Sequence, residues 1–274
     1  MSLVRSVLEI WKFRELVWTL AWKDIVVRYK QAYMGAAWTI LKPVMLMLVF
    51  TLMRSFIGID SGGIPYPVLT FTALIPWVFF QEGVALGVTS VVLNAVLVKK
   101  IYFPREVFPL TAVLTKVVEF CVDLFVLAAL MAWYGMLPSL QVLWLPALLA
   151  YLILTTLAVN LAGAALNVYY RDVSQLLPVA ISLVMYASPI IYPLSLVQQT
   201  LLVRMAAGTA SKALFFLYTM NPLVGIINAF QNILLRDQPP DFAIMWPGAL
   251  LVFAVLPLSY ALFKRMETSF ADVI

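Results

Sequence analysis

YPVLTFTALIPWVFFQEGVALGVTSVVLN, residues 66–94, contains a single charged side chain, Glu82. An α-helix needs about 20 predominantly apolar residues to cross the hydrocarbon core of a bilayer, and this stretch exceeds that length. The stretch therefore predicts a membrane-spanning helix. Pro76 within it is tolerated if neighbouring helices satisfy the freed carbonyl, and it predicts a kink.

Five further segments of the same kind lie before and after this one. They cover residues 34–57, 112–134, 141–166, 174–196 and 242–263. Only 11% of the 274 residues are charged, whereas a soluble domain carries about 25%. We therefore expect an all-α integral membrane protein with six transmembrane helices, folded as a single domain over residues 1–274.

Lysine and arginine are unevenly distributed between the two sides of this arrangement. With a cytoplasmic N-terminus, 13 of the 18 lie on the cytoplasmic side and four on the outer side, while Lys116 lies within a span. Cytoplasmic loops carry the excess of these residues, so both termini are expected to be cytoplasmic. The opening residues lack the apolar core and cleavage site of a signal peptide, and we expect the N-terminus to be retained.

Residues 3–33 follow a different pattern from the spans, because three tryptophans alternate with charged side chains. Arg5, Glu9 and Lys12 recur at helical spacing. This pattern indicates an amphipathic helix that lies in the cytoplasmic membrane interface, with its tryptophans at headgroup depth. The alternative is an ordinary surface helix.

Two short apolar runs, around 213–218 and 223–235, lie between the fifth and sixth spans, with Asn221-Pro222 between them. Apolar runs of roughly 10–14 residues more often re-enter the membrane or lie at its surface than cross it. We predict two short re-entrant helices over 213–235 on the outer side. The alternative is a loosely folded outer loop.

The third span contains three charged residues, Lys116, Glu119 and Asp123, whose spacing places them on one helix face. Charges within spans are costly and therefore indicate function. One interpretation is a polar stripe that faces a partner or a transport path. The other is a self-satisfied cluster with Lys116 paired to Glu119. Glu82 in the second span has no obvious local partner.

Several kinds of chemistry are excluded by composition. The chain has no histidine and one cysteine, Cys121, so we expect no metal site and no catalytic triad. No phosphate-binding loop with a following Lys-Ser or Lys-Thr is present, so ATP hydrolysis must belong to another chain. The net charge of +5 is too small and too dispersed to indicate nucleic-acid binding.

Residues 94–109 form a basic cytoplasmic loop interrupted by Pro104 and Pro109. A short helix here would project from the membrane and could fit a groove of a soluble partner. Alternatively, the loop is an anchor that touches only lipid headgroups.

Several strings together resemble the polysaccharide-export permeases of the ABC-2 type, and specifically their O-antigen (lipopolysaccharide) branch. They are WKDIVVRYK (22–30) followed by Gly35, Trp38 and Pro43, LIPW (74–77), FPR (103–105), YRD (170–172), SP (188–189), NP (221–222) and KRME (264–267). They occur in order from about residue 15 to the end of the chain. Lys23 departs from the family pattern, where arginine is common, but both residues are basic.

The resemblance implies a homodimer of six-span permeases in the bacterial inner membrane, assembled with two copies of a separate ABC ATPase that binds ATP and Mg. This chain would bind no cofactor itself. The implied substrate is a glycan on a lipid carrier, typically undecaprenyl pyrophosphate for O-antigen. Membrane lipids are the remaining partners.

The resemblance also implies roles for individual residues. Contact with the ATPase falls on Trp22, Lys23, Asp24, Arg28, Lys99, Lys100, Phe103, Pro104 and Arg105. A periplasmic gate falls on Phe215, Phe216, Tyr218, Asn221 and Pro222. Basic side chains near the cytoplasmic headgroups can attract a pyrophosphate, and these are Arg28, Lys30, Lys42, Lys99 and Lys100. Each of these cations has the alternative role of a plain topology signal.

The sequence also allows other functions, some within the class of ABC exporters and some outside it. The cargo could instead be teichoic acid, capsule or a small molecule. A secondary transporter or channel would need no ATPase, but such proteins often carry inverted repeats and midplane ion sites, and neither is visible here. A membrane-embedded enzyme lacks a recognisable catalytic pair in this chain.

Overall fold

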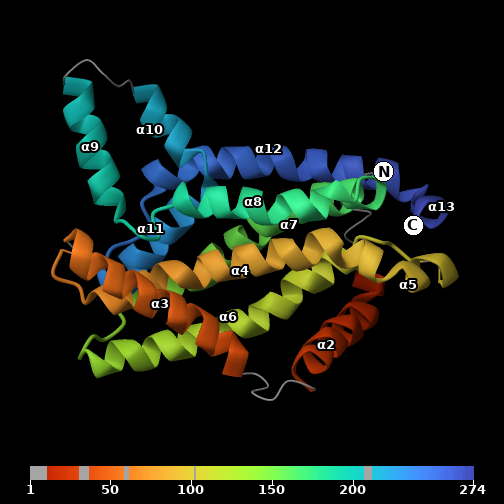
Figure 1. Ribbon diagram of the computed structural model, residues 1–274, viewed down its shortest axis with the longest axis horizontal. Helices are drawn as coiled ribbons and strands as arrows, with labels where there is room; N and C mark the ends of the chain where they lie inside the picture. The colour runs from red at the N-terminus through yellow and green to blue at the C-terminus, as the bar shows by residue number, and fades with distance from the viewer. Residues whose placement is uncertain (1–10, 31–36, 59–61, 102, 207–211) are drawn as a thin grey trace.

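The computed structural model describes residues 11–30, 37–58, 62–101, 103–206 and 212–274. Within these ranges the secondary structure is helical and contains no strand (Figure 1). The elements are α2 (Arg14–Lys30), α3 (Ala37–Ile57), α4 (Tyr66–Leu93), α5 (Ala95–Lys100), α6 (Val107–Trp133), the 3-10 helix η1 (Leu140–Trp144), α7 (Leu145–Tyr169), α8 (Asp172–Tyr186), α9 (Leu194–Ala206), α10 (Lys212–Thr219), α11 (Pro222–Leu235), α12 (Phe242–Glu267) and α13 (Phe270–Val273). The all-α prediction is thus confirmed for the described residues.

Helices long and apolar enough to cross a membrane occur in the described part of the chain. Three qualify by length and composition, Tyr66–Leu93, Leu140–Tyr169 and Phe242–Glu267. A fourth arises if α10 and α11, which meet at 80°, are counted as one broken span. α6 is long enough at 27 residues, but its three charges interrupt the apolar run. These features are those of a multi-pass membrane protein.

α4 forms the centre of the bundle. It packs against α3, α6, α7, α8 and α11. Trp77, Phe71 and Leu74 on α4 are completely buried, so the helix has no long exposed face. The segment whose composition predicted a span is therefore also the core of the fold.

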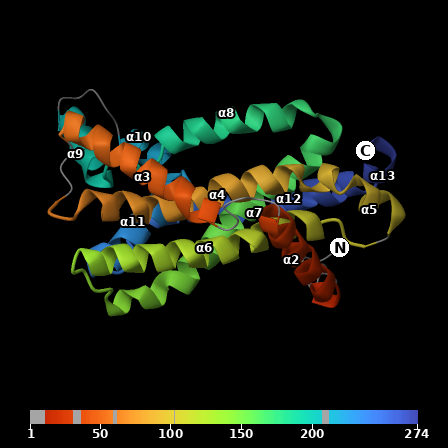
Figure 2. The same cartoon turned by 60° about the horizontal axis from the view of Figure 1, so that its bottom comes forward.

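The molecule has two distinct ends. Figures 1 and 2 both show α5, α13 and the C-terminus at one end, and α9 and α10 at the opposite end. α2 lies near the first of these ends and packs against α6. Residues 3–10 and 31–33 of the predicted interface helix lie outside the described residues.

The fifth predicted segment, 174–196, differs from a continuous helix. α8 ends at Tyr186, residues 187–193 are irregular, and α9 begins at Leu194. Pro189 and Pro193 explain the break, because proline lacks the N–H that a helix interior requires. α9 was not expected, whereas the two short helices predicted within 213–235 correspond to α10 and α11.

α11 and α12 approach each other unusually closely at Gly248. A Cβ atom at this position would lie 2.7 Å from the Cα of Pro222, the first residue of α11. The neighbouring atom belongs to the backbone, so it cannot move aside as a flexible side chain could. Small residues allow such close packing between helices in membranes.

Gly248→Ala is therefore expected to destabilise the protein by about 1–3 kcal/mol, since overpacking forces backbone shifts of this cost. The measurement is the midpoint of detergent-driven unfolding in mixed micelles. Ala254→Ser is the matched control, because it also adds one heavy atom to α12 but on an exposed position. Equal midpoints for the two variants would show that the contact is not tight.

Candidate functional site

Charged side chains from four helices meet between α2, α3, α4 and α6. The members of this charge network are Arg28 on α2, Lys42 on α3, Glu82 on α4, and Lys116 and Glu119 on α6. Arg28 Nη1 donates to Glu119 Oε1 at 2.8 Å. Lys42 Nζ donates to Glu82 Oε1 at 3.0 Å. The network therefore connects α2 to three helices of the bundle.

Lys116 is the central member of the charge network. Its side chain is 1% exposed, and its ammonium donates to both Glu82 and Glu119. Burying an ammonium is costly unless carboxylates pair with it. The predicted Lys116–Glu119 pair is present, and Glu82, which had no local partner in the sequence, is paired across helices.

Gly83 allows this arrangement because it brings α4 close to α6 and α7. A Cβ atom there would lie 3.0 Å from Cγ2 of Thr156 and 3.9 Å from Cγ of Lys116. The contact with Thr156 is tight, whereas that with Lys116 is an ordinary van der Waals distance. The glycine therefore lets α4 approach α7 closely beside the buried lysine.

Asp123, the third charge on α6, stands apart from these pairs. It is 3% exposed, and its Oδ1 has no hydrogen-bond partner among the described residues. The predicted stripe thus divides into two residues inside the charge network and one outside it.

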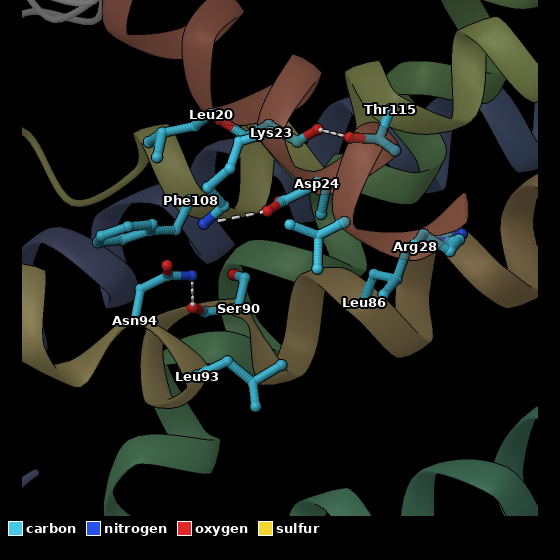
Figure 3. Close-up of a pocket in the computed structure, with 13 residues that line it drawn as sticks. Leu20, Lys23, Asp24, Arg28, Leu86, Ser90, Leu93, Asn94, Phe108 and Thr115 are labelled. Atoms are coloured by element: carbon cyan, nitrogen blue, oxygen red, sulfur yellow. Dashed lines mark hydrogen bonds and ion pairs between the residues drawn. The ribbon is translucent and has the colours of Figure 1, made fainter. Parts of the chain in front are cut away.

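A cavity of about 270 Å³ lies between α2 and the ends of α4 and α6 (Figure 3). α2 contributes both polar and apolar side chains to it, including Lys23 and Asp24, which form an ion pair at 3.2 Å. The wall from α4 and α6 is mixed as well and includes Leu86 and Asn94. Arg28 also lines the cavity, so the charge network borders it directly.

α5 is the short helix that the basic loop predicted. Its Val98 is buried, while Lys99 and Lys100 are exposed. Leu93 before it and Val96 within it are 73% and 64% exposed. The tip of the molecule therefore presents apolar and basic side chains together, a combination suited to a groove with acidic edges.

The residues after α5 are bound to the end of α12. Arg105 N donates to Glu267 Oε1 at 2.9 Å, and Lys264 Nζ donates to Glu106 Oε2 and Glu267 Oε2, both at 2.8 Å. Burial raises the pKa of Glu106 above its ordinary value, and the contact with Lys264 opposes this rise. Sequence reasoning missed this cluster, although the opposite charges of its members were visible.

Phe103 and Pro104, for which the sequence resemblance predicts contact with the ATPase, lie in the same loop. Phe103 is buried, and its ring packs edge-on against Phe108 at 5.3 Å. Pro104 is half-buried. Phe103 thus anchors the loop from inside, while Trp22 on α2 is 58% exposed.

The remaining basic side chains divide into paired and exposed groups. Arg28 and Lys42 belong to the charge network. Lys30, Lys99 and Lys100 are exposed.

Asn221 organises the break between α10 and α11. Its Oδ1 accepts from Leu223 N at 3.1 Å, which caps α11, and its Nδ2 donates to Ser188 Oγ at 3.0 Å. Phe215 and Tyr218 on α10 are half-buried, and Phe216 packs on Trp246 at 5.5 Å between ring centroids. Pro222 contributes the close contact with Gly248. The predicted gate residues thus share one region that joins α10, α11 and α12.

The described residues offer no group of three or more His, Cys, Asp or Glu side chains that could hold a metal ion. The chemistry available at the charge network and at the α5 tip is ionic pairing and packing. Such contacts can pass a displacement of one helix to the helices that it touches.

The sequence of this chain is similar to those of known membrane transporters. Residues 15–235 match the ABC-2 type transporter family. The chain is similar to the O-antigen export system permease protein RfbA of Myxococcus xanthus, with 28% identity over 273 residues, 99% of this chain and 100% of the relative. Two Klebsiella pneumoniae permeases of the same name are 26% identical over 256 and 255 residues, 92% of each chain. Since the family match covers most of its length, the chain belongs to the ABC-2 type transporter family.

Proposed function

We propose that this chain is the permease subunit of an ATP-driven exporter that moves lipid-linked polysaccharide, O-antigen on undecaprenyl pyrophosphate, across the bacterial inner membrane. The observation that carries this proposal is the similarity to permeases named for O-antigen export over 99% of this chain. The chain supplies the membrane path. ATP and Mg are bound by a separate ATPase subunit.

In this proposal, six helices cross the membrane and both termini are cytoplasmic. The spans are α3, α4, α6, α7 and α12, together with a fifth span made of α8 and the irregular residues 187–193 after it. α2 lies in the cytoplasmic interface, and α10 and α11 re-enter from the outer side. The 13 to 4 distribution of basic residues supports this orientation, because it places α5 and the C-terminus in the cytoplasm.

The working unit is a homodimer with two ATPase subunits. Six helices can hardly enclose a path wide enough for a glycan chain, so two subunits share it. α8 supports this idea, since Ile181 is its only buried residue, and Figure 2 shows α8 at the edge of the bundle. A second copy could cover this helix.

α5 is the proposed coupling helix, and α2 is the second contact with the ATPase. The apolar and basic side chains exposed on α5 suit a groove in a soluble partner. Arg28 on α2 contacts Glu119 on α6. Movement of α2 would thus reach the spans through the charge network.

The exposed cations Lys99 and Lys100 are candidates to attract the pyrophosphate of the lipid carrier. The double variant Lys99→Ala/Lys100→Ala is then expected to raise the carrier concentration needed for half-maximal stimulation of ATP hydrolysis by about thirtyfold, since each cation contributes roughly 1 kcal/mol. Lys212→Ala, at an exposed position on the proposed outer side, is the control. Unchanged stimulation together with normal insertion would reject this role.

Co-purification tests the proposed function itself. The permease is expressed with candidate ABC ATPases from the same genome, reconstituted in nanodiscs, and assayed for ATP hydrolysis with and without lipid-linked glycan. We expect a stable 2:2 complex whose hydrolysis responds to the glycan. Response to a teichoic acid or capsule carrier instead would change the cargo, and failure of a well-folded permease to bind the ATPase would return a secondary transporter to consideration.

A further inference from the structure

The C-terminal end of the chain packs on the coupling helix and on the loop that follows it. We infer that residues 264–273 form a clamp that holds α5 in position and ties its movement to α12. The clamp involves contacts within the permease alone, and its part in energy transfer rests on the proposed function.

The polar half of the clamp consists of hydrogen bonds between the end of α12 and the loop that follows α5. Glu267 accepts from the backbone N–H of Arg105 at 2.9 Å, and its own carbonyl accepts from the Arg105 guanidinium. Lys264 lies one turn earlier on α12 and donates to Glu106 at 2.8 Å. Because Glu106 directly precedes α6, these bonds fix both the loop and the start of that helix.

The apolar half of the clamp is an aromatic cluster around Phe270. This side chain is completely buried, with ring centroids 5.4 Å from Phe263 and 6.3 Å from Tyr169. α13 packs against α5 and α7. Val98, the buried residue of α5, belongs to the same apolar cluster as Phe270.

α5 depends on these contacts for its order. It has six residues, and Val98 is the only one that is buried. Isolated helices shorter than about 12–15 residues are marginal in water. The helix must therefore be held by its neighbours, and both α13 and α4 contact it.

The clamp connects the coupling helix to the far end of the bundle. α12 extends from Lys264 at the clamp to Gly248, where it touches the start of α11. A rise of about 1.5 Å per residue makes this distance about 24 Å along the helix. A displacement of α5 is thus passed to α12, which contacts the proposed gate directly.

The first arm of the test uses hydrogen–deuterium exchange on the permease alone in nanodiscs. Phe270→Ala and Lys264→Met are expected to speed exchange in residues 95–101 by about tenfold or more. The first removes a buried ring from the apolar cluster that contains Val98, and the second removes hydrogen bonds between charged groups; either loss is large enough for such a change. Val273→Ala and Arg265→Met are matched controls, because these side chains are exposed on the same segments. Unchanged exchange in α4 and α7 verifies that each variant is folded, and Phe270→Leu should restore most of the protection.

The second arm measures ATP hydrolysis by the assembled complex with and without glycan. Phe270→Ala and Lys264→Met are expected to reduce the stimulation by glycan about tenfold, while the controls retain it. Unchanged exchange in residues 95–101 would overturn the clamp, and faster exchange with full stimulation would overturn its part in energy transfer. If the wild-type permease binds no ATPase, the proposed function fails, but the exchange arm still decides whether the clamp exists.

Discussion

Lys116→Met is expected to lower the free energy of unfolding by about 3–5 kcal/mol, the cost of removing one partner from a buried ion pair. The ammonium of Lys116 contacts both Glu82 and Glu119, so its loss leaves two carboxylates without their shared partner. Methionine keeps most of the side-chain volume, which limits the effect of a cavity. The measurement is reversible unfolding in mixed micelles with increasing denaturing detergent.

The control for this experiment also removes the two carboxylates that share Lys116. Lys116→Met combined with Glu82→Gln and Glu119→Gln leaves the cations Arg28 and Lys42, whose side chains are 29% and 60% exposed and can be hydrated, so we expect most of the stability to return. Buried ion pairs can often be replaced by neutral groups at little cost. Wild-type stability of the single variant would show that Lys116 is not held as a buried cation.

Arg28→Met is expected to reduce the stimulation of ATP hydrolysis by lipid-linked glycan about tenfold, within the usual range of coupling between sites. Arg28 is the member of the charge network on α2, and Glu119 is its partner at 2.8 Å. Binding of the ATPase should persist, because the Arg28 side chain is bound to Glu119 of α6 and the exposed side chains of α2 and α5 are unchanged. ATP hydrolysis by the reconstituted complex, titrated with glycan, is the readout.

A double-mutant cycle identifies the contact responsible. Arg28→Met with Glu119→Gln should be no worse than the more severe single variant, because both remove the same link. Arg14→Met is the control, as an exposed arginine on the same helix. Additive losses would mean that the two residues act independently and that α2 does not transmit movement through this pair.

Much of the fold could be predicted from the chain itself. Long apolar runs give α4, α7 and α12 with boundaries close to those expected, because length and hydropathy are local properties. The short helix α5 and the pair α10 and α11 followed from proline positions and run lengths. α6 begins at Val107 rather than at 112, because Phe108 and Pro109 extend its first turn beyond the apolar segment.

The charge network could be predicted only in part. Lys116 and Glu119 are three residues apart, so helical spacing predicts their contact. Glu82 is 34 residues from Lys116 and 40 from Lys42. These partners depend on how α3, α4 and α6 pack, which a single sequence does not state.

The clamp around Phe270 illustrates the same limit. Phe270 lies in a short segment near the charged residues Glu267 and Asp272, and this local pattern does not predict that the Phe270 ring is buried. The segment is buried because α13 folds back onto α5 and α7. A pattern within one segment cannot show that two distant segments cover each other.

Export in reconstituted proteoliposomes tests the central claim most directly. Vesicles that contain the permease and its ATPase receive lipid-linked glycan on the side of the ATPase, and a lectin detects glycan that reaches the other side. We expect translocation that requires ATP and stops when the ATPase is omitted. Translocation driven by an ion gradient without the ATPase would contradict the account and make the protein a secondary transporter.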